Sequence, residues 1–207
     1  MTRRRSYRSL ASLKRDNRVC RACAEAGYPL ESLPVVSSYV GQRAYMLGQA
    51  PGSKEGEERR PWRGRAGRTL RRWLSLDEET FYATFYCAAV TRCYPGRASS
   101  GRGDRAPTHD ERELCSFWRE AELRLLAPEL IVTVGGLALH AVLRVDRLTA
   151  VIGTRLALGP VPVIPLPHPS GASGWLNDPE NRTRLDRALA LVSAECARLQ
   201  SSGLPAA

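Results

Sequence analysis

Four short, continuously apolar segments, separated by amphipathic stretches, constrain the fold of this chain most strongly. They read AYML, YCAAV, LIVTV and VPVIPL, at residues 44–47, 86–90, 130–134 and 161–166. Strands that are buried on both faces of a parallel sheet have this pattern, whereas half-exposed strands alternate. Apolar strands that alternate with helical segments predict an α/β domain of three layers, with helices flanking a mostly parallel, four-stranded sheet.

The limits of that domain are predicted from charge and polarity. Residues 1–19 are rich in arginine and lack the apolar stretch of a secretory signal, so we expect a basic arm that is mobile or lies on phosphates. Residues 20–200 hold all four apolar segments and are expected to form a single domain. Residues 201–207 are expected to form a frayed tail. Residues 149–158 contain β-branched side chains and are expected to add a hairpin or an edge strand.

Arginine dominates the charge of the chain, which has a formal net charge of +10 and only two lysines, Lys14 and Lys54. This excess favours a polyanionic partner such as nucleic acid, although a protein with arginine-biased composition has the same signature. No run of about 18 apolar residues is present, so no membrane-spanning helix is expected. We therefore expect a cytoplasmic protein with no membrane partner.

Each predicted strand ends in a loop marked by glycine, proline or histidine. Ligands of open α/β sheets bind beyond the carboxyl ends of the strands, so we expect these loops to converge on one crevice. Trp62 precedes the GRAG segment that opens a helix and is expected to form one wall. His168 lies between two prolines, which suits a group held in place before reaction. A structural loop with an exposed histidine is the alternative.

A long basic loop from Cys93 to His109 follows the second strand. Its glycines and arginines suit a phosphate backbone, and a loop of this length in a compact domain is more often functional than idle. Asp104 is the only acid in the loop and lies between Arg102 and Arg105. Asp104 is therefore a candidate catalytic acid, although a solvated turn aspartate would have the same signal.

Four of the six cysteines have the spacing of metal ligands. Cys20 and Cys23 form a CxxC pair, Cys93 follows the second strand, and Cys115 lies in the next predicted helix. No export signal accompanies them, which argues against disulfides. A CxxC pair and two distant thiolates could hold an iron–sulfur cluster or zinc. Alternatively, Cys93 and Cys115 are core thiols and the CxxC pair is incidental.

Taken in order, these motifs resemble those of the uracil-DNA glycosylase superfamily, and most closely its iron–sulfur branches, families four and five. The matches are GQAPG at 48–52, Glu55, PW at 61–62, GRAG at 64–67, RCYP at 92–95, GDR at 103–105, Cys115 and HPS at 168–170. They cover roughly residues 20–195, and the ordered set is far more specific than any one motif. The resemblance implies a DNA glycosylase of base excision repair that acts on DNA containing a deaminated base, most often uracil. We expect a monomer with a bacterial-type, nucleoid-associated use. Because the chain has only two lysines, we also expect a monofunctional enzyme.

The resemblance also implies roles for individual residues. The positions that match ligands of a [4Fe–4S] cluster are Cys20, Cys23, Cys93 and Cys115. The positions that match substrate-binding residues are Gly48, Ala50, Trp62, Ala89 and Ser170. The positions expected to contact DNA are Arg65, Arg92, Arg102, Arg105 and Ser173. Trp62 stands where the family has a phenylalanine that stacks on the flipped uracil, and His168 where a histidine contacts uracil O2.

Three residues depart from the family's pattern. Gln49 replaces the glutamate of a GEAPG-type motif, Ala89 stands where an asparagine usually reads the uracil edge, and Asp104 stands where a GNR motif has asparagine. These departures suggest that the acid has moved. We predict that Asp104 positions the water with help from Gln49, that Glu55 is the second candidate acid, and that His168 donates to the leaving base.

Other functions fit parts of this pattern. A catalytically silent iron–sulfur protein that binds nucleic acid would also lack the glutamate and the asparagine. A nucleotide-processing α/β protein is disfavoured because the GQAPG loop lacks the G-x-x-x-x-G-K-[ST] pattern. A lyase needs an amine nucleophile, and neither Lys14 in the arm nor Lys54 in a charged loop is expected to be buried in the crevice.

Overall fold

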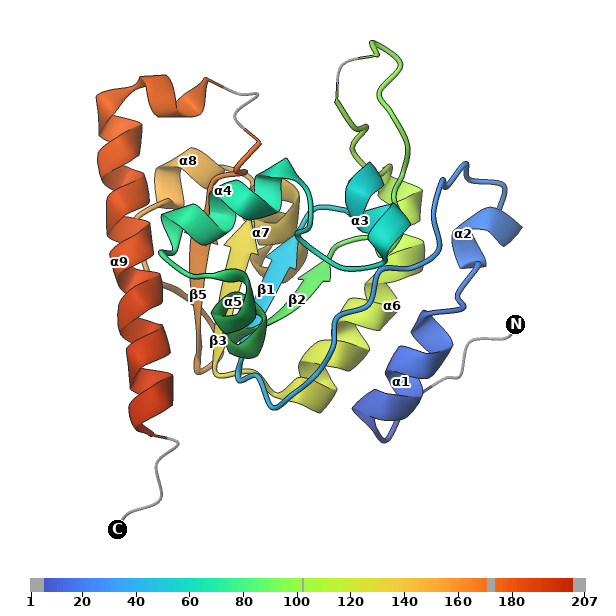
Figure 1. Cartoon of the computed structure of the whole chain (residues 1–207), viewed down its shortest axis with the longest axis horizontal. Helices are drawn as coiled ribbons and strands as arrows, with labels where there is room; N and C mark the ends of the chain where they lie inside the picture. The colour runs from blue at the N-terminus through green and yellow to red at the C-terminus, as the bar shows by residue number, and fades with distance from the viewer. Residues whose placement is uncertain (1–5, 102, 171–173, 203–207) are drawn as a thin grey trace.

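A five-stranded sheet forms the centre of the computed structural model, which describes residues 6–101, 103–170 and 174–202 (Figure 1). The strands are β1 (Ala44–Gly48), β2 (Phe85–Ala89), β3 (Leu130–Val134), β4 (Leu156–Leu158) and β5 (Val161–Leu166), in the order β2-β1-β3-β5-β4. The four predicted strands pair in parallel, as expected. The sheet is not four-stranded, however, because β4 adds an antiparallel edge strand next to β5.

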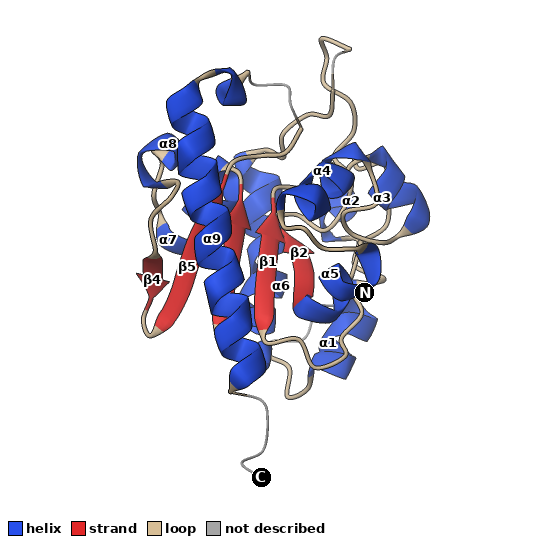
Figure 2. Cartoon of the chain, turned by 60° about the vertical axis from the view of Figure 1, so that its left-hand side comes forward, coloured by secondary structure: helices blue, strands red, loops and turns tan. Residues whose placement is uncertain are grey.

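Helices cover both faces of the sheet, which confirms the three-layer prediction (Figure 2). The helices that pack on one face are α4 (Arg65–Trp73), α5 (Glu78–Thr84) and α9 (Pro179–Ser201). Those on the other face are α6 (His109–Leu126) and α7 (Gly136–Leu143). The shorter elements are α1 (Leu10–Asn17), α2 (Ala22–Glu25), α3 (Ser53–Glu58), α8 (Leu148–Val151) and the 3-10 turn η1 (Trp175–Asn177).

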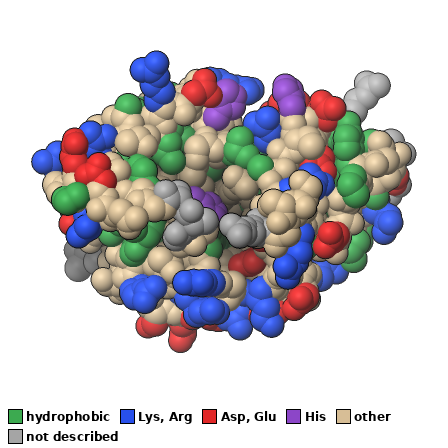
Figure 3. Space-filling model, turned by 90° about the horizontal axis from the view of Figure 1, so that it is seen from above, with side chains coloured by type: hydrophobic (Ala, Val, Ile, Leu, Met, Phe, Trp, Pro, Cys, Tyr) green, Lys and Arg blue, Asp and Glu red, His purple; other side chains and the backbone are tan. Residues whose placement is uncertain are grey.

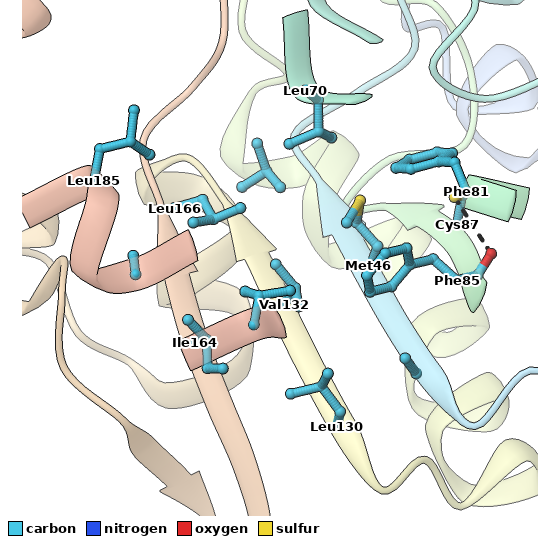
Figure 4. Packing of buried hydrophobic residues seen from close by; sticks show 14 of the residues in the cluster. Met46, Leu70, Phe81, Phe85, Cys87, Leu130, Val132, Ile164, Leu166 and Leu185 are labelled. Atoms are coloured by element: carbon cyan, nitrogen blue, oxygen red, sulfur yellow. Dashed lines mark hydrogen bonds between the residues drawn. The ribbon is translucent and has the colours of Figure 1, made fainter. Parts of the chain in front are cut away.

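The strands are apolar at every position because both faces of the sheet are buried. On one face, Met46 of β1 lies in a cluster with Leu70 of α4 and Leu185 of α9 (Figure 4). The two neighbours of Met46 in β1, Tyr45 and Leu47, point to the other face and pack with side chains of α6 and α7. None of the helices among the described residues is long and apolar enough to cross a membrane.

The N-terminal segment differs from the predicted free arm. From residue 6 onward it is part of the domain, because α1 begins at Leu10 with Ser9 as its cap and packs against α6. Tyr7 and Leu13 are buried there beside Trp118. Lys14 and Arg15 within α1, and the arginines that flank it in the sequence, obscure its short apolar stripe. Residues 1–5 and 203–207 lie outside the described residues.

Arg92 is buried between the end of β2 and α6, which corrects the prediction that it contacts DNA. Only 2% of Arg92 is exposed, and its guanidinium forms an ion pair with Glu122 of α6. Glu122 also accepts hydrogen bonds from the hydroxyls of Tyr45, at 2.9 Å, and Tyr86, at 3.1 Å. A buried charge needs such partners. Arg92 therefore ties β2 to α6 and cannot reach a phosphate.

Candidate active site

A cavity of about 670 Å³, called here the strand-end cavity, lies beyond the carboxyl ends of β1, β2 and β5. Its walls come from residues 48–55, 61–62, 64–66, 87–89 and 103–105, together with Val35, His168 and Ser170. Figure 3 looks onto this face of the molecule, which is hollowed near its middle and carries Lys and Arg side chains along its lower edge. The loops after β1, β2 and β5 thus converge as predicted. The loop after β3, which was expected to join them, contributes none of the described lining residues; its Gly135 lies next to His168 instead.

Trp62 is held in one position by its backbone and by two glycines. Its φ of +59° lies in the left-handed region, and its carbonyl accepts a hydrogen bond from Arg71 Nη1 at 2.9 Å. A Cβ on Gly67 would lie 1.8 Å from that carbonyl oxygen, and a Cβ on Gly48 would lie 2.8 Å from the indole ring. Only glycine fits at both positions. The indole therefore forms a fixed wall of the strand-end cavity, as predicted.

His168 lies at the opening of the strand-end cavity, directly after β5. Gly135, at the end of β3, has a φ of +90° and supports the imidazole, since a Cβ there would lie 3.6 Å from His168 Cδ2. Although part of the side chain is exposed, its partial desolvation lowers the pKa of His168. The imidazole is therefore neutral at pH 7 and can offer one N–H to a ligand.

Asp104 lies at the base of its loop, where it borders the strand-end cavity. Its backbone forms an isolated bridge with Arg97, and its Oδ1 accepts a hydrogen bond from the hydroxyl of Tyr94 at 2.9 Å. Its Oδ2 lies on the side of Gly52, where a Cβ would be 3.1 Å away. Burial, and then the hydrogen bond to Asp104, raises the pKa of Tyr94 to about 12. The Tyr94 hydroxyl therefore keeps its proton at neutral pH.

Glu55 also borders the strand-end cavity, but both of its oxygens are occupied. Oε2 accepts from the backbone N–H of Gly52 at 3.2 Å, and Oε1 accepts from that of Gly64 at 2.6 Å. Gly52 caps α3 and Gly64 caps α4, so one buried carboxylate connects the starts of two helices. This geometry favours a structural role for Glu55 and makes Asp104 the better candidate acid.

The remaining predicted substrate residues also line the strand-end cavity. They are Gly48, Gln49, Ala50, Ala89 and Ser170. Gly48 and Ala89 are register partners at the ends of β1 and β2, so the departure from asparagine at Ala89 lies on the floor of the cavity. Gln49 follows Gly48 directly and brings an amide side chain to the same end of β1.

The predicted DNA contacts have different surroundings. Arg65 is exposed at the first turn of α4 and borders the strand-end cavity, where a phosphate would also meet the positive end of the helix. Both guanidinium arms of Arg105 are bound to Glu111, at 2.6 and 2.8 Å, which favours a structural role. Arg102 and Ser173 lie outside the described residues.

The four predicted metal ligands line a second cavity of about 280 Å³, the cysteine cavity. Cys20 and Cys23 come from α2 and the turn before it, Cys93 from the loop after β2, and Cys115 from α6. No three or more His, Cys, Asp or Glu side chains among the described residues form a group that could hold a metal ion. Four sulfur donors therefore share a cavity without closing around one centre.

Three observations fit a sulfur-rich group in the cysteine cavity. The side chain of Asn17 is fully buried on its wall, and neither of its polar atoms has a partner. The backbone N–H of Arg92 donates to Cys115 Sγ at 3.3 Å, as hydrogen bonds to cluster sulfurs do. Burial, and then the neighbouring thiols, raises the pKa of Cys23 to about 12, a cost that a bound cation removes.

Sequence reasoning missed two residues of these sites, Tyr94 and Asn17. Tyr94 was visible only as part of the RCYP motif, and its contact with Asp104 depends on the fold of the loop between them. Asn17 ends α1 inside a segment that read as a free arm. A buried asparagine with no partner has no signature in a sequence.

Comparison with known proteins places this geometry in a family. The model of the uracil DNA glycosylase superfamily matches residues 37–191. A type-4 uracil-DNA glycosylase of Sulfurisphaera tokodaii is 28% identical over 131 residues, which cover 61% of this chain and 54% of the relative. A type-4 uracil-DNA glycosylase of Thermotoga maritima is 30% identical over 131 residues, which cover 62% of this chain and 65% of the relative. The matched region thus spans less than two thirds of each curated relative.

Proposed function

This chain belongs to the uracil DNA glycosylase superfamily, and on that premise we propose that it hydrolyses the N-glycosidic bond of a deaminated base, most often uracil, in DNA. The observation that carries this proposal is that Trp62, His168 and Asp104 line one cavity at the strand ends. An aromatic wall can stack an extruded base, a neutral N–H donor can stabilise the departing base, and a carboxylate can stabilise the sugar cation.

The reaction develops charges of opposite sign at the two ends of the bond that breaks. The sugar gains oxocarbenium character, and the departing base carries negative charge on its oxygen. His168 would donate its N–H to that oxygen, which is the donor that a developing anion needs. Asp104 would face the sugar, stabilise its positive charge and hold the attacking water, with Gln49 orienting that water.

A base inside a duplex must first leave the stack, at a cost of a few kcal/mol. Stacking on a fixed indole offsets about 1–3 kcal/mol of that cost. Trp62 supports this step because its position is set before the base arrives. Arg65 would hold a phosphate next to the extruded nucleotide.

We propose that the product is an intact abasic strand. A lyase would need an uncharged amine in the cavity. Lys54 does border the strand-end cavity, but its ammonium is largely exposed and pairs with Glu58 at 3.2 Å. A charged, solvated ammonium is a poor nucleophile for the sugar.

We assign the cysteine cavity to a [4Fe–4S] cluster held by Cys20, Cys23, Cys93 and Cys115, with zinc as the alternative. Such a cluster would cross-link α2, the loop after β2 and α6. None of the described residues lines both cavities, so the cluster would supply a structural cross-link and would not contact the substrate. Iron, sulfide and zinc contents of anaerobically purified protein, together with its visible spectrum, distinguish the two.

The proposal is tested with the full chain and oligonucleotides that contain one uracil, hypoxanthine or xanthine. Free base and alkali-labile sites are measured on single and double strands, with a thymine strand as the control. Release of uracil with an uncleaved strand supports the proposal. Strand cleavage without alkali would contradict monofunctional hydrolysis.

A catalytically silent DNA-binding protein is the second candidate, and the replacement of an amide by Ala89 on the cavity floor favours it. It predicts binding to each of these oligonucleotides with no base released from any of them. The same assay therefore separates the two functions.

A further inference from the structure

We propose that Tyr94 is the positioning residue of the reaction, holding the carboxylate of Asp104 in the orientation that catalysis requires. The inference rests on the proposed function, since it concerns the acid assigned there. It adds a residue that neither the motifs nor the comparisons single out. Its basis is one hydrogen bond, from Tyr94 Oη to Asp104 Oδ1 at 2.9 Å, and the rigidity of the two groups that it joins.

Tyr94 is a rigid donor. Only 4% of it is exposed, and its backbone is fixed on both sides by the segment before β1. Its N–H donates to Ser32 Oγ at 2.8 Å, and its carbonyl accepts from the N–H of Glu31 at 3.0 Å. The preceding residue, Cys93, lines the cysteine cavity. The phenol is therefore anchored to the segment before β1, independently of the part of the loop that carries Asp104.

The backbone of Asp104 is held by other contacts. Asp104 pairs with Arg97, and the N–H of Arg105 donates to the carbonyl of Gly96 at 2.9 Å. The side chain of Arg105 is fixed on Glu111, which is fully buried. These contacts close the base of the loop without Tyr94. Removing the phenol hydroxyl should therefore release the carboxylate while leaving the loop in place.

The hydrogen bond also gives the two carboxylate oxygens of Asp104 different surroundings. Oδ1 is engaged by Tyr94, whereas Oδ2 lies on the side of Gly52 in the GQAPG loop. A carboxylate whose one oxygen is fixed presents the other in a defined direction, and a group held in its productive geometry avoids the cost of reorganisation. Asp104 is exposed, so nothing buries it in this orientation.

The test compares Tyr94→Phe with Tyr28→Phe in single-turnover release of uracil. Tyr28 is a matched control, because its hydroxyl donates to Asp110 at 3.1 Å and it does not border the strand-end cavity. Loss of a hydrogen bond to a charged group predicts that Tyr94→Phe is slower by about 10- to 100-fold, with unchanged DNA affinity. Tyr28→Phe should match the wild type.

A double-mutant cycle separates positioning from a general effect on structure. In an Asp104→Ala background, Tyr94→Phe should cause no further loss, because no carboxylate remains to be positioned. Melting temperature and metal content are measured for each variant. If Tyr94→Phe fails to fold, Asp104→Glu replaces it, since the longer acid loses the same geometry and should be slowed to a similar degree.

The outcomes distinguish the two proposals. An active wild type with an equally active Tyr94→Phe variant would overturn the positioning role alone, as would additive losses in the cycle. A folded wild type that releases neither uracil nor hypoxanthine nor xanthine would overturn the proposed function and this role with it. An active wild type with a slow, non-additive Tyr94→Phe variant supports both.

Discussion

Two carboxylates border the strand-end cavity, and their surroundings give them different roles. Both oxygens of Glu55 bind backbone amides, and the residue is only 8% exposed. Asp104 is exposed and has one oxygen left for a ligand. The sequence offers both as acids near glycine-rich loops. The hydrogen bonds of Glu55 to the residues that begin α3 and α4 distinguish its structural role from the role of Asp104.

Glu55→Ala should destabilise the protein more than it affects a chemical step. The substitution removes two hydrogen bonds from backbone N–H groups to the Glu55 carboxylate, and each is worth about 1.5–3 kcal/mol. Chemical unfolding measures the change, with Glu57→Ala as the control, since Glu57 is exposed and lies 3.9 Å from Lys54. A Glu55→Ala variant as stable as that control, yet inactive, would instead make Glu55 a catalytic acid.

His168 should make the stability of the protein depend on pH. Desolvation lowers its pKa in the folded state, so between the folded value and the ordinary value of about 6.5 the unfolded state binds more protons. Stability therefore falls as the pH drops through that interval. His168→Gln should remove this part of the decline in melting temperature between pH 7.5 and 5. Parallel curves for the two proteins would contradict the shift.

At the scale of elements, the strands were predictable and some of the helices were not. Segments buried on both sides are apolar throughout, which is why β1, β2, β3 and β5 stand out in the sequence. The helix α3 has the sequence SKEGEE and no apolar stripe, so it read as a loop. Its fold depends on Glu55 binding Gly64, a contact nine residues away that no local pattern encodes.

Gly67→Ala should disable the site through the backbone of Trp62. A Cβ at Gly67 would lie 1.8 Å from the Trp62 carbonyl oxygen, so the segment must move at a cost of about 1–3 kcal/mol or more. Uracil release and DNA affinity should both fall. Gly136→Ala is the matched control, because its Cβ would meet nothing within 4 Å and alanine favours a helix. Equal activity in the two variants would show that Trp62 is not fixed in this way.

At the scale of the whole molecule, the net charge predicted a polyanionic partner but not which arginines meet it. Arg92 pairs with Glu122 inside the domain and Arg105 pairs with Glu111 at a helix start. Arg92 and Glu122 are 30 positions apart in the sequence, and Arg105 and Glu111 are six apart across the start of α6, so no local pattern marks either pair. The gathering of the four cysteines along one cavity, by contrast, was predictable from their spacing and from the resemblance.

DNA binding should weaken steeply as the salt concentration rises, because released counterions drive it. Arg65→Ala should reduce the slope of log K against log salt by about 1. Arg155→Ala should leave the slope unchanged, since Arg155 pairs with Glu195 and does not border the strand-end cavity. Fluorescence anisotropy with a labelled oligonucleotide measures both slopes. A flat salt response of the wild type would argue against a nucleic-acid substrate.

The most direct test of the account is single-turnover release of uracil by two histidine variants. His168 borders the strand-end cavity, whereas His140 is on α7, paired with Asp146 at 2.7 Å, and does not border it. His168→Ala should be slower than the wild type by about 100-fold or more, the usual effect of removing one preorganised donor, whereas His140→Ala should be unchanged. Equal rates for the two variants would contradict the role proposed for His168.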